Sequence, residues 1–257
     1  MEATSSRAIS GRPGPISSVR KSWSIAVKDM KIYYFKPAIL MFGMLFPVTI
    51  FFAFMMSRDV EAKTLFPGLI ALTLFFSTTT VAPFSIPWER MNRTFERLLF
   101  APVSLSALAL GKTISSLVFG LVMSLVPLLI GLIFYGSSVA SAAALALGII
   151  LGSACISNMG TLVSTVSSET PQNVMLLLNL VRLPMMFMSG IFIPISQLPT
   201  WGRVIAWFSP VSYAVDLLRR GLGFKDYFGP VVSSLMLVAF GVAMYALSVL
   251  RMRSWNR

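Results

Sequence analysis

The sequence predicts an all-α membrane protein with six transmembrane helices, and three observations support this prediction. First, 56% of the 257 residues are hydrophobic and 12% are charged, whereas a soluble domain carries about 25% charged residues. Second, the mean hydropathy is +0.81. Third, the apolar residues gather into six runs, each long enough to provide the roughly 20 residues that a helix needs to cross a bilayer.

The N-terminal region precedes the first apolar run. Residues 1–18 are rich in Ser, Gly, Pro and Arg without apolar periodicity, so we expect a disordered cytoplasmic tail. Residues 19–36 predict an amphipathic helix on the membrane surface, whose cations can bind anionic lipid headgroups. Its apolar stripe is Trp23, Val27, Met30 and Tyr34, and its cations are Arg20, Lys21, Lys28, Lys31 and Lys36.

The six apolar runs form a transmembrane domain at residues 37–250. Cytoplasmic loops are enriched in Lys and Arg, and this rule orients the runs. With a cytoplasmic N-terminus, the inner side holds fourteen of the 21 cations and the outer side holds six. We therefore expect both termini, including the tail at 251–257, to be cytoplasmic. The expected spans are about 37–56, 65–86, 107–134, 139–165, 173–193 and 229–250.

Composition also bears on chemistry and partners. Histidine is absent, so the commonest metal ligand and general base is missing. Nearly all of the nine carboxylates lie outside the apolar runs, and the single cysteine, Cys155, lies inside one. We therefore expect no catalytic site, metal site or intrachain disulfide. The cations border spans and form no single face, which argues against nucleic-acid binding.

A charged stretch, WERMNRTFERLLFAPVS at 88–104, interrupts the apolar sequence after the second span. Its spacing predicts a short two-faced helix on the cytoplasmic side, with Pro87 in the first turn and Pro102 as the stop. We expect this helix to dock a partner; the alternative is an inner-leaflet helix that only anchors the spans. The candidate residues are Trp88, Glu89, Arg90, Arg93, Thr94, Phe95, Glu96, Arg97 and Leu98.

A near match to a phosphate-binding loop follows at residues 106–113, SALALGKT. Ser106 replaces the first glycine of the G-x-x-x-x-G-K-[ST] pattern, and no strand precedes it to present a phosphate cradle. We therefore predict no nucleotide site here, and interpret Lys112 as an anchor at the cytoplasmic interface. If the protein uses ATP, another subunit must hold it.

The segment 194–228 is too apolar for an ordinary loop and too broken for a span. Trp201, Val204, Ile205 and Phe208 share one helical face, while Ser209 is a candidate cap before a second short helix that Gly221 ends. We expect two re-entrant helices that dip into the outer leaflet and pack against the spans. The candidate residues of this external gate are Trp201, Trp207, Pro210 and Tyr213.

Arg182 is the one clear charge inside an expected span, about 13 Å along the helix from Asn173. Charges at this depth are costly and mostly functional, so we expect Arg182 to attract an anionic headgroup. The alternatives are an arginine that reaches the inner surface, or one bonded to Asn179 or a carbonyl. Other pathway candidates, for which ordinary packing is the alternative, are Met185, Met186, Asn158 and Thr79.

Two stretches resemble the signatures of type-two ABC exporter permeases. They are WERMNRTFERLLFAPVSLSALALGK at 88–112 and SGIFIPISQLPTWGRVIAWFSPVSYAVDLLRRGL at 189–222. With the six expected spans, the resemblance covers about residues 19–250. It implies a six-span subunit in a dimer, here expected to be a homodimer. It also implies two copies of a separate ABC ATPase subunit, which hold ATP and Mg, so this chain carries no cofactor of its own.

In such a permease, the element matching 88–100 docks on the ATPase, the element matching 19–36 lies alongside, and the two external helices cap the pathway. Exporters of drugs, lipid-linked glycans and polysaccharides share this plan, so the resemblance implies export across the plasma membrane of a prokaryote, as in multidrug resistance. For this chain we expect a drug, lipid or lipid-linked glycan. The sparse polar groups of the spans favour a hydrophobic or amphipathic substrate. One alternative is an ATP-independent secondary carrier or flippase, for which Glu169 is the only nearby carboxylate. A membrane-anchored scaffold would leave the external helices without a role.

Overall fold

The computed structural model describes residues 15–56, 62–94, 104–134, 136, 138–166 and 170–253 of the chain. Over these residues the regular elements are all helices, which confirms the predicted all-α class. The helices are α1 (Pro15–Tyr33), α2 (Pro37–Leu40), α3 (Phe46–Met56), α4 (Ala62–Thr78), α5 (Val81–Met91), α7 (Leu105–Phe134), α8 (Ala142–Ser164), α9 (Pro171–Met188), α10 (Thr200–Phe208), α11 (Pro210–Gly221) and α12 (Pro230–Arg253). A π-helical turn, η1 (Met41–Leu45), joins α2 to α3, and a 3₁₀ turn, η2 (Ile195–Gln197), precedes α10.

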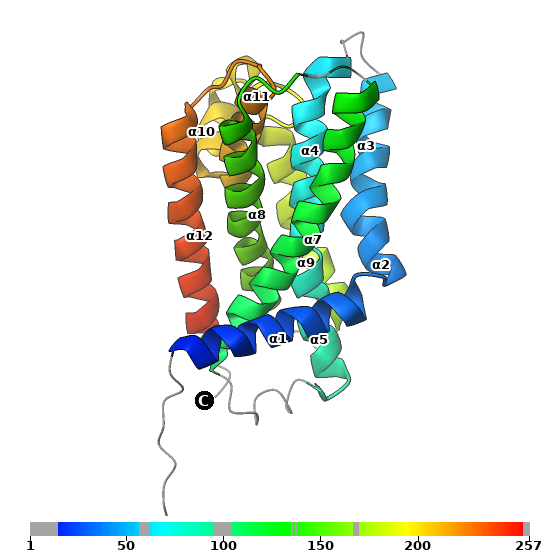
Figure 1. The fold of residues 1–257 in the computed structure, drawn as a ribbon, viewed down its shortest axis with the longest axis vertical. Helices are drawn as coiled ribbons and strands as arrows, with labels where there is room; N and C mark the ends of the chain where they lie inside the picture. Colours follow the sequence, from blue (N-terminus) through cyan, green and yellow to red (C-terminus); the bar gives the residue numbers. More distant parts are fainter. Residues whose placement is uncertain are drawn as a thin grey trace, which may run out of the picture.

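The long helices form one bundle, and α1 lies across one end of it while α10 and α11 lie at the other (Figure 1). We call these the α1 end and the α10–α11 end. The chain turns by 94° between α1 and the helix that follows Pro37. The last turns of α12 return to the α1 end, where Val249 and Met252 pack with Ile25 of α1. The start of α1 and the end of α12 therefore share one end of the bundle.

Four helices within the described ranges are long and apolar enough to cross a membrane: Thr64–Met91, Leu105–Phe134, Ala142–Ser164 and Pro230–Met252. A fifth span is added if the bent pair, Val19–Tyr33 with Pro37–Ala53, counts as one. The expected fifth span corresponds to α9, whose polar residues, including Asn179 and Arg182, lower its hydropathy. The chain is thus a multi-pass membrane protein, and the count of six spans stays a prediction.

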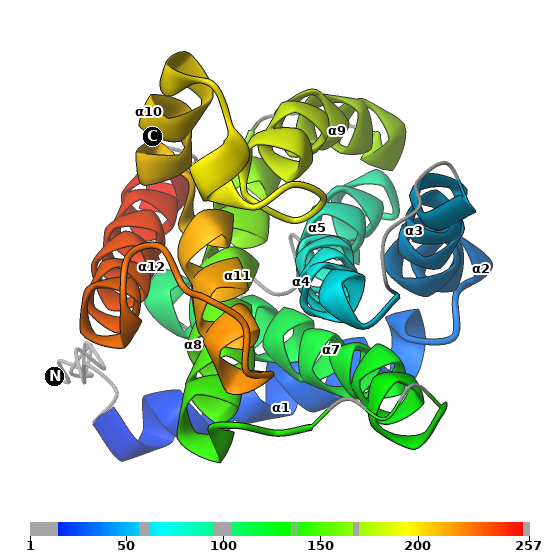
Figure 2. The same cartoon turned by 90° about the horizontal axis from the view of Figure 1, so that it is seen from above.

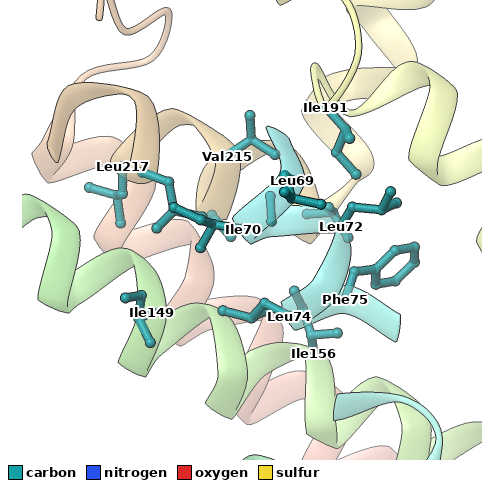
Figure 3. Packing of buried hydrophobic residues seen from close by; sticks show 14 of the residues in the cluster. Leu69, Ile70, Leu72, Leu74, Phe75, Ile149, Ile156, Ile191, Val215 and Leu217 are labelled. Atoms are coloured by element: carbon teal, nitrogen blue, oxygen red, sulfur yellow. The ribbon is translucent and has the colours of Figure 1, made fainter. Parts of the chain in front are cut away.

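The helix pair α4–α5 occupies the centre of the bundle (Figure 2), and 94% of its most apolar window is buried. The surrounding helices approach it closely, as small residues allow in membrane proteins. A Cβ added to Gly120 of α7 would lie 2.0 Å from Cγ2 of Thr78 on α4. Figure 3 shows the core around α4: Leu69, Ile70, Leu72, Leu74 and Phe75 meet Ile149, Ile156, Ile191, Val215 and Leu217.

The buried face of α1 differs from the apolar stripe that we predicted. The protein-facing residues include Ser22, Ala26 and Asp29, each fully buried, whereas Trp23 of the predicted stripe is 54% exposed. A search for apolar periodicity misses this face, because small and charged side chains, Ser22, Ala26 and Asp29, alternate with its buried apolar residues Ile25 and Tyr33.

The two short helices predicted in 194–228 are present as α10 and α11, although their depth in a membrane stays a prediction. Trp201, Val204, Ile205 and Phe208 are exposed on α10, as their shared face suggested. The expected cap is wrong: the Ser209 side chain makes no capping bond to α11. Its hydroxyl instead lies 2.6 Å from the hydroxyl of Ser189, which ties the start of α11 to the end of α9.

Candidate functional site

An ionic cluster of four side chains joins three helices at the α1 end. Lys112 of α7 lies 2.9 Å from a carboxylate oxygen of Asp29 on α1 and 2.8 Å from one of Glu89 on α5. Lys28 of α1 completes the cluster by pairing with the same two carboxylates. Lys112 and Asp29 are fully buried and Glu89 is 3% exposed. We call these four residues the ionic cluster.

The ionic cluster balances its own charge, since two lysines face two carboxylates. Burial of ions is costly unless partners and hydrogen bonds compensate, and here each carboxylate has two cations. Burial lowers the pKa of Lys28, but the charges of Asp29 and Glu89 raise it by more, so the net pKa lies above its ordinary value. Burial, followed by the nearby Glu89, also raises the pKa of Tyr33, whose hydroxyl is 3.5 Å from Glu89. Lys28 is therefore charged, and Tyr33 neutral, at neutral pH.

Three of our interpretations are corrected by this geometry. Glu89, expected to contact a partner protein, pairs with the lysines of the ionic cluster instead. Lys112, expected to be an anchor at the cytoplasmic interface, is a buried member of the same cluster. Lys28, expected to bind lipid headgroups, pairs with Glu89. Sequence patterns within one helix miss such pairs. Lys28 and Glu89 are 61 residues apart in the chain, and Glu89 and Lys112 are 23 apart.

The predicted docking helix does not begin at Pro87. Instead, Pro87 lies inside α5, which continues from the central helix to Met91. The chain then turns at Asn92 and Arg93, and Arg93 adopts a left-handed φ of 54°. One uninterrupted helix through these residues is therefore wrong, because a helical spacing of side chains can continue across a break. The candidates Phe95, Glu96, Arg97 and Leu98 lie outside the described residues.

The turn is nevertheless a surface feature at the tip of the central helix. The side chains from Met91 to Thr94 are exposed. The hydroxyl of Thr94 donates a 3.1 Å hydrogen bond to the carbonyl of Glu89, which fixes the turn to α5 beside the ionic cluster. Trp88 stacks on Phe84 at 5.5 Å, and the Lys36 ammonium lies 5.3 Å from the Trp88 ring centre. Of the α1 candidates, Arg20, Trp23 and Lys31 are exposed.

Arg182 is fully buried between α9 and the break between α4 and α5. Its Nε donates to the Thr79 hydroxyl at 2.7 Å, and one Nη donates to the Thr80 hydroxyl at 3.1 Å and to the Phe76 carbonyl at 3.3 Å. The other Nη lies 3.5 Å from the Asn179 amide oxygen. This is the alternative we considered, bonding to Asn179 and a carbonyl. An anionic headgroup would have to replace these bonds.

The structure does not gather the pathway candidates around one space. It brings Arg182 and Thr79 together, but Asn158 accepts a 3.0 Å hydrogen bond from Thr113 of α7. Met186 belongs to the buried core, and Met185 packs against that core.

An apolar cavity of about 470 Å³, which we did not predict, lies between the α2–η1 segment, α5 and α9. Phe84 and Trp88 of α5 and Phe42 of η1 form part of its wall. The other wall is one face of α9, whose spacing in the sequence is a usable signal: Gln172, Met175, Leu176, Asn179, Leu180 and Leu183. Through Trp88, this cavity adjoins the tip of the central helix.

At the α10–α11 end, three of the four gate candidates come together. Tyr213 is fully buried, and its hydroxyl donates a 2.7 Å hydrogen bond to the Trp207 carbonyl across Pro210. Both rings contact Phe228, with centroids at 4.7 and 4.8 Å. Trp201 instead lies on the exposed face of α10, 60% exposed.

Asp216 of α11 is a structural residue that sequence reasoning missed. Its carboxylate accepts hydrogen bonds from the backbone amides of Tyr227, Phe228 and Gly229, and a 3.0 Å bond from the Ser233 hydroxyl. These donors lie at the N-terminus of α12, where a negative charge is favourable. Asp216 thereby fastens α12 to α11.

The fold and these sites define a multi-pass helical membrane protein with a charged end and a compact double-helix element at the opposite end. Comparison with known proteins gives its family. The model of the ABC-2 type transporter family matches residues 16–222. The chain belongs to this family of ABC transporter membrane subunits.

Two relatives illustrate the similarity. The inner membrane transport permease YadH of Escherichia coli (strain K12) is 27% identical over 181 residues, which are 70% of this chain and 70% of YadH. The probable multidrug ABC transporter permease YbhR of the same strain is 24% identical over 155 residues, 60% of this chain. The matched region spans 42% of YbhR.

Proposed function

We propose that the chain is the permease subunit of an ATP-driven ABC exporter for a hydrophobic or amphipathic substrate. The substrate class would be a drug, lipid or lipid-linked glycan, moved from the cytoplasm or the inner leaflet. Membership of the ABC-2 type transporter family supports the transport role. The names of YbhR and YadH, a multidrug permease and an inner membrane permease, agree with it.

The observation that carries the proposal is the exposed turn at Asn92 and Arg93. This turn lies at the tip of the helix that forms the centre of the bundle. In the most apolar stretch of that helix, 94% is buried. A displacement applied to this tip must move the packed helices around it, because packed interiors deform little. We therefore assign the exposed turn and the residues that follow it, 91–98, as the contact with a separate ATPase subunit.

The ionic cluster connects the proposed ATPase contact to two further helices. It links α1, α5 and α7 through paired charges, so the three helices respond to a load at the tip as one unit. Separation of any pair would leave a buried charge without its partner, which is costly. The α1 helix, with exposed Arg20 and Lys31, lies beside the ATPase contact and on the inner lipid surface.

The proposal includes the partners of the chain and its location. Two ATPase copies hold ATP and Mg, and two copies of this chain form the membrane unit in a prokaryotic plasma membrane, with both termini cytoplasmic. Leu176 and Leu180 of α9 are 64% and 62% exposed and adjoin the apolar cavity. We assign the cavity to the substrate, and propose that the second subunit packs against the outward-facing parts of Leu176 and Leu180 and closes the cavity.

An ATP-independent carrier or flippase is less well supported. A carrier needs intramembrane carboxylates for ion coupling. Asp29 and Glu89 are held by lysines in the ionic cluster, and Glu169 lies outside the described residues.

The test is a double charge reversal, Arg93→Glu with Arg97→Glu, in vesicles that contain the chain and its ATPase. We expect normal insertion, reduced transport, and loss of substrate-stimulated ATP hydrolysis. The matched control is Arg58→Glu with Lys63→Glu, an equal charge change in the segment expected on the outer side. Wild-type coupling in the Arg93 and Arg97 variant would contradict the proposal.

A further inference from the structure

A polar hollow of about 470 Å³ opens at the α10–α11 end, and the proposed transport mechanism does not use it. One wall is the segment from Gly190 to η2, and the opposite wall is the last turns of α11 with the loop that leads to α12. Its lining includes two carboxylates, Asp216 and Asp226, and two cations, Arg219 and Lys225. Whether each of these four groups already has a partner within the protein determines which ligand the hollow can bind.

Both carboxylates are already occupied. Asp216 accepts three backbone amides and the Ser233 hydroxyl. Asp226 accepts a 2.8 Å bond from Arg220, a residue outside the lining of the hollow. Because both carboxylates already have hydrogen-bond or ionic partners, neither needs a cationic group from a ligand.

The two cations, by contrast, retain unused donors. The half-buried Arg219 guanidinium contacts the ring of Phe224 at 6.0 Å and feels the charge of Asp216. Among the described residues it forms no side-chain hydrogen bond or ion pair. Lys225 is exposed and likewise has no acidic partner in the described ranges. The hollow therefore has a cationic wall with free donors, of which the half-buried guanidinium of Arg219 gains most from a charged hydrogen-bond partner.

We propose that this hollow binds a phosphate-type anion through Arg219 and Lys225. A guanidinium offers two parallel donors that match phosphate oxygens, and an ammonium adds a mobile point charge. The volume exceeds that of a bare anion and leaves room for a headgroup with its waters. The site lies opposite the ATPase contact and does not depend on that contact being correct.

Two sources could provide this chemistry: free phosphate or the headgroup of a phospholipid. The neighbouring helix α10 favours the lipid. Its Trp201, Val204 and Phe208 side chains are 60%, 54% and 75% exposed and form an apolar face next to η2, which lines the hollow. Such a face lies in the boundary between headgroups and acyl chains, where it would hold the tails of a lipid whose phosphate enters the hollow.

The test measures binding of inorganic phosphate and of dihexanoyl phosphatidylglycerol to the purified full-length chain in a neutral detergent. Isothermal titration calorimetry gives both affinities. We expect Arg219→Gln with Lys225→Gln to weaken binding at least tenfold, and Arg219→Lys to weaken it less. The matched control is Arg58→Gln with Lys63→Gln, which removes the same two charges from a segment outside the lining of the hollow and should change the affinity less than twofold.

The outcomes are distinct. Binding of both probes, lost in the double variant, supports a headgroup site; binding of phosphate alone, lost in the same way, supports a site for the free anion. Equal binding by the wild type and the double variant, or no binding of either probe, overturns the proposal. If the double variant does not fold, the test is a competition experiment in which sulfate is added to the wild type with the bound probe. Failure of sulfate to displace the probe then overturns the proposal. Loss of anion binding with intact ATPase coupling would separate this site from the transport function.

Discussion

Two fully buried cations of this protein, Lys112 and Arg182, are stabilised in opposite ways. Lys112, in the ionic cluster, faces the carboxylates of Asp29 and Glu89. Arg182 has no carboxylate partner among the described residues and is surrounded by hydroxyl, amide and carbonyl oxygens. The first arrangement depends on every member keeping its charge. The second uses a break in the central helix to supply neutral acceptors, so it tolerates a neutral replacement.

The largest effect should come from removing one member of the ionic cluster. Lys112→Met leaves Asp29 and Glu89 sharing only Lys28, and breaking a buried ion pair costs about 3–5 kcal/mol. We expect a much lower melting temperature of the detergent-solubilised chain, measured by fluorescence-detected size exclusion after heating. Lys31→Met, which removes an exposed lysine from α1, is the control and should melt close to the wild type. Equal melting of the two variants would contradict the structural role of the cluster.

An intermediate effect is expected at Asp216, at the α10–α11 end. Like Arg182 it is an ion held by neutral groups, but its partners are hydrogen-bond donors instead of acceptors. Asp216→Ala leaves the amides at the start of α12 without an acceptor, at a cost of about 1–3 kcal/mol. The same melting assay checks this value. Asp226→Ala breaks the partly exposed pair with Arg220 and should cost less than about 1 kcal/mol. The reverse order of the two variants would show that α12 is not fastened through Asp216.

A smaller effect is expected for Arg182→Met. The Thr79 and Thr80 hydroxyls also donate to the carbonyls of Phe75 and Phe76, so they keep a partner when the guanidinium is lost. Replacing a buried ion by an apolar side chain of similar length is often close to neutral, so we expect a loss below about 1 kcal/mol. A loss as large as that of Lys112→Met would remove the distinction between the two cations.

The smallest effect is a pH dependence of the ionic cluster. The folded pKa of Lys28 is raised above its ordinary 10.5, and that of Tyr33 is raised above its ordinary 10.0. The unfolded chain therefore releases both protons at lower pH than the folded chain, and stability is lost as the pH rises through these values. We expect a constant melting temperature from about pH 7 to pH 9, then a decline above about pH 10. The decline should be weaker in Lys28→Met with Tyr33→Phe; an identical decline would exclude these groups as its source.

The sequence predicts helices and their limits well where composition changes sharply. The third apolar run was expected at 107–134 and forms α7 from Leu105 to Phe134. Pro210 and Gly221 mark the first and last residues of α11 because their backbone preferences act locally. Hydropathy and proline or glycine signals need only neighbouring residues, so one sequence suffices to find them.

The site was predicted less completely, because its contacts join distant parts of the chain. Glu89 was found as a residue of interest, but its lysine partners come from α1 and α7 and cannot be inferred from helical spacing. The left-handed Arg93 interrupts a segment whose side-chain pattern is continuous. The hydroxyls that surround Arg182 face it because the central helix breaks at Thr79 and Thr80, a tertiary feature.

The central claim is that the tip of the central helix contacts an ATPase on the cytoplasmic side. The most direct test replaces the buried Cys155 by alanine and introduces Arg93→Cys as the only cysteine. We expect this cysteine to cross-link to the ATPase subunit and to react with a membrane-impermeant maleimide only from the cytoplasmic face. Labelling from the outer face, or intact coupling with no cross-link to the ATPase, would contradict it.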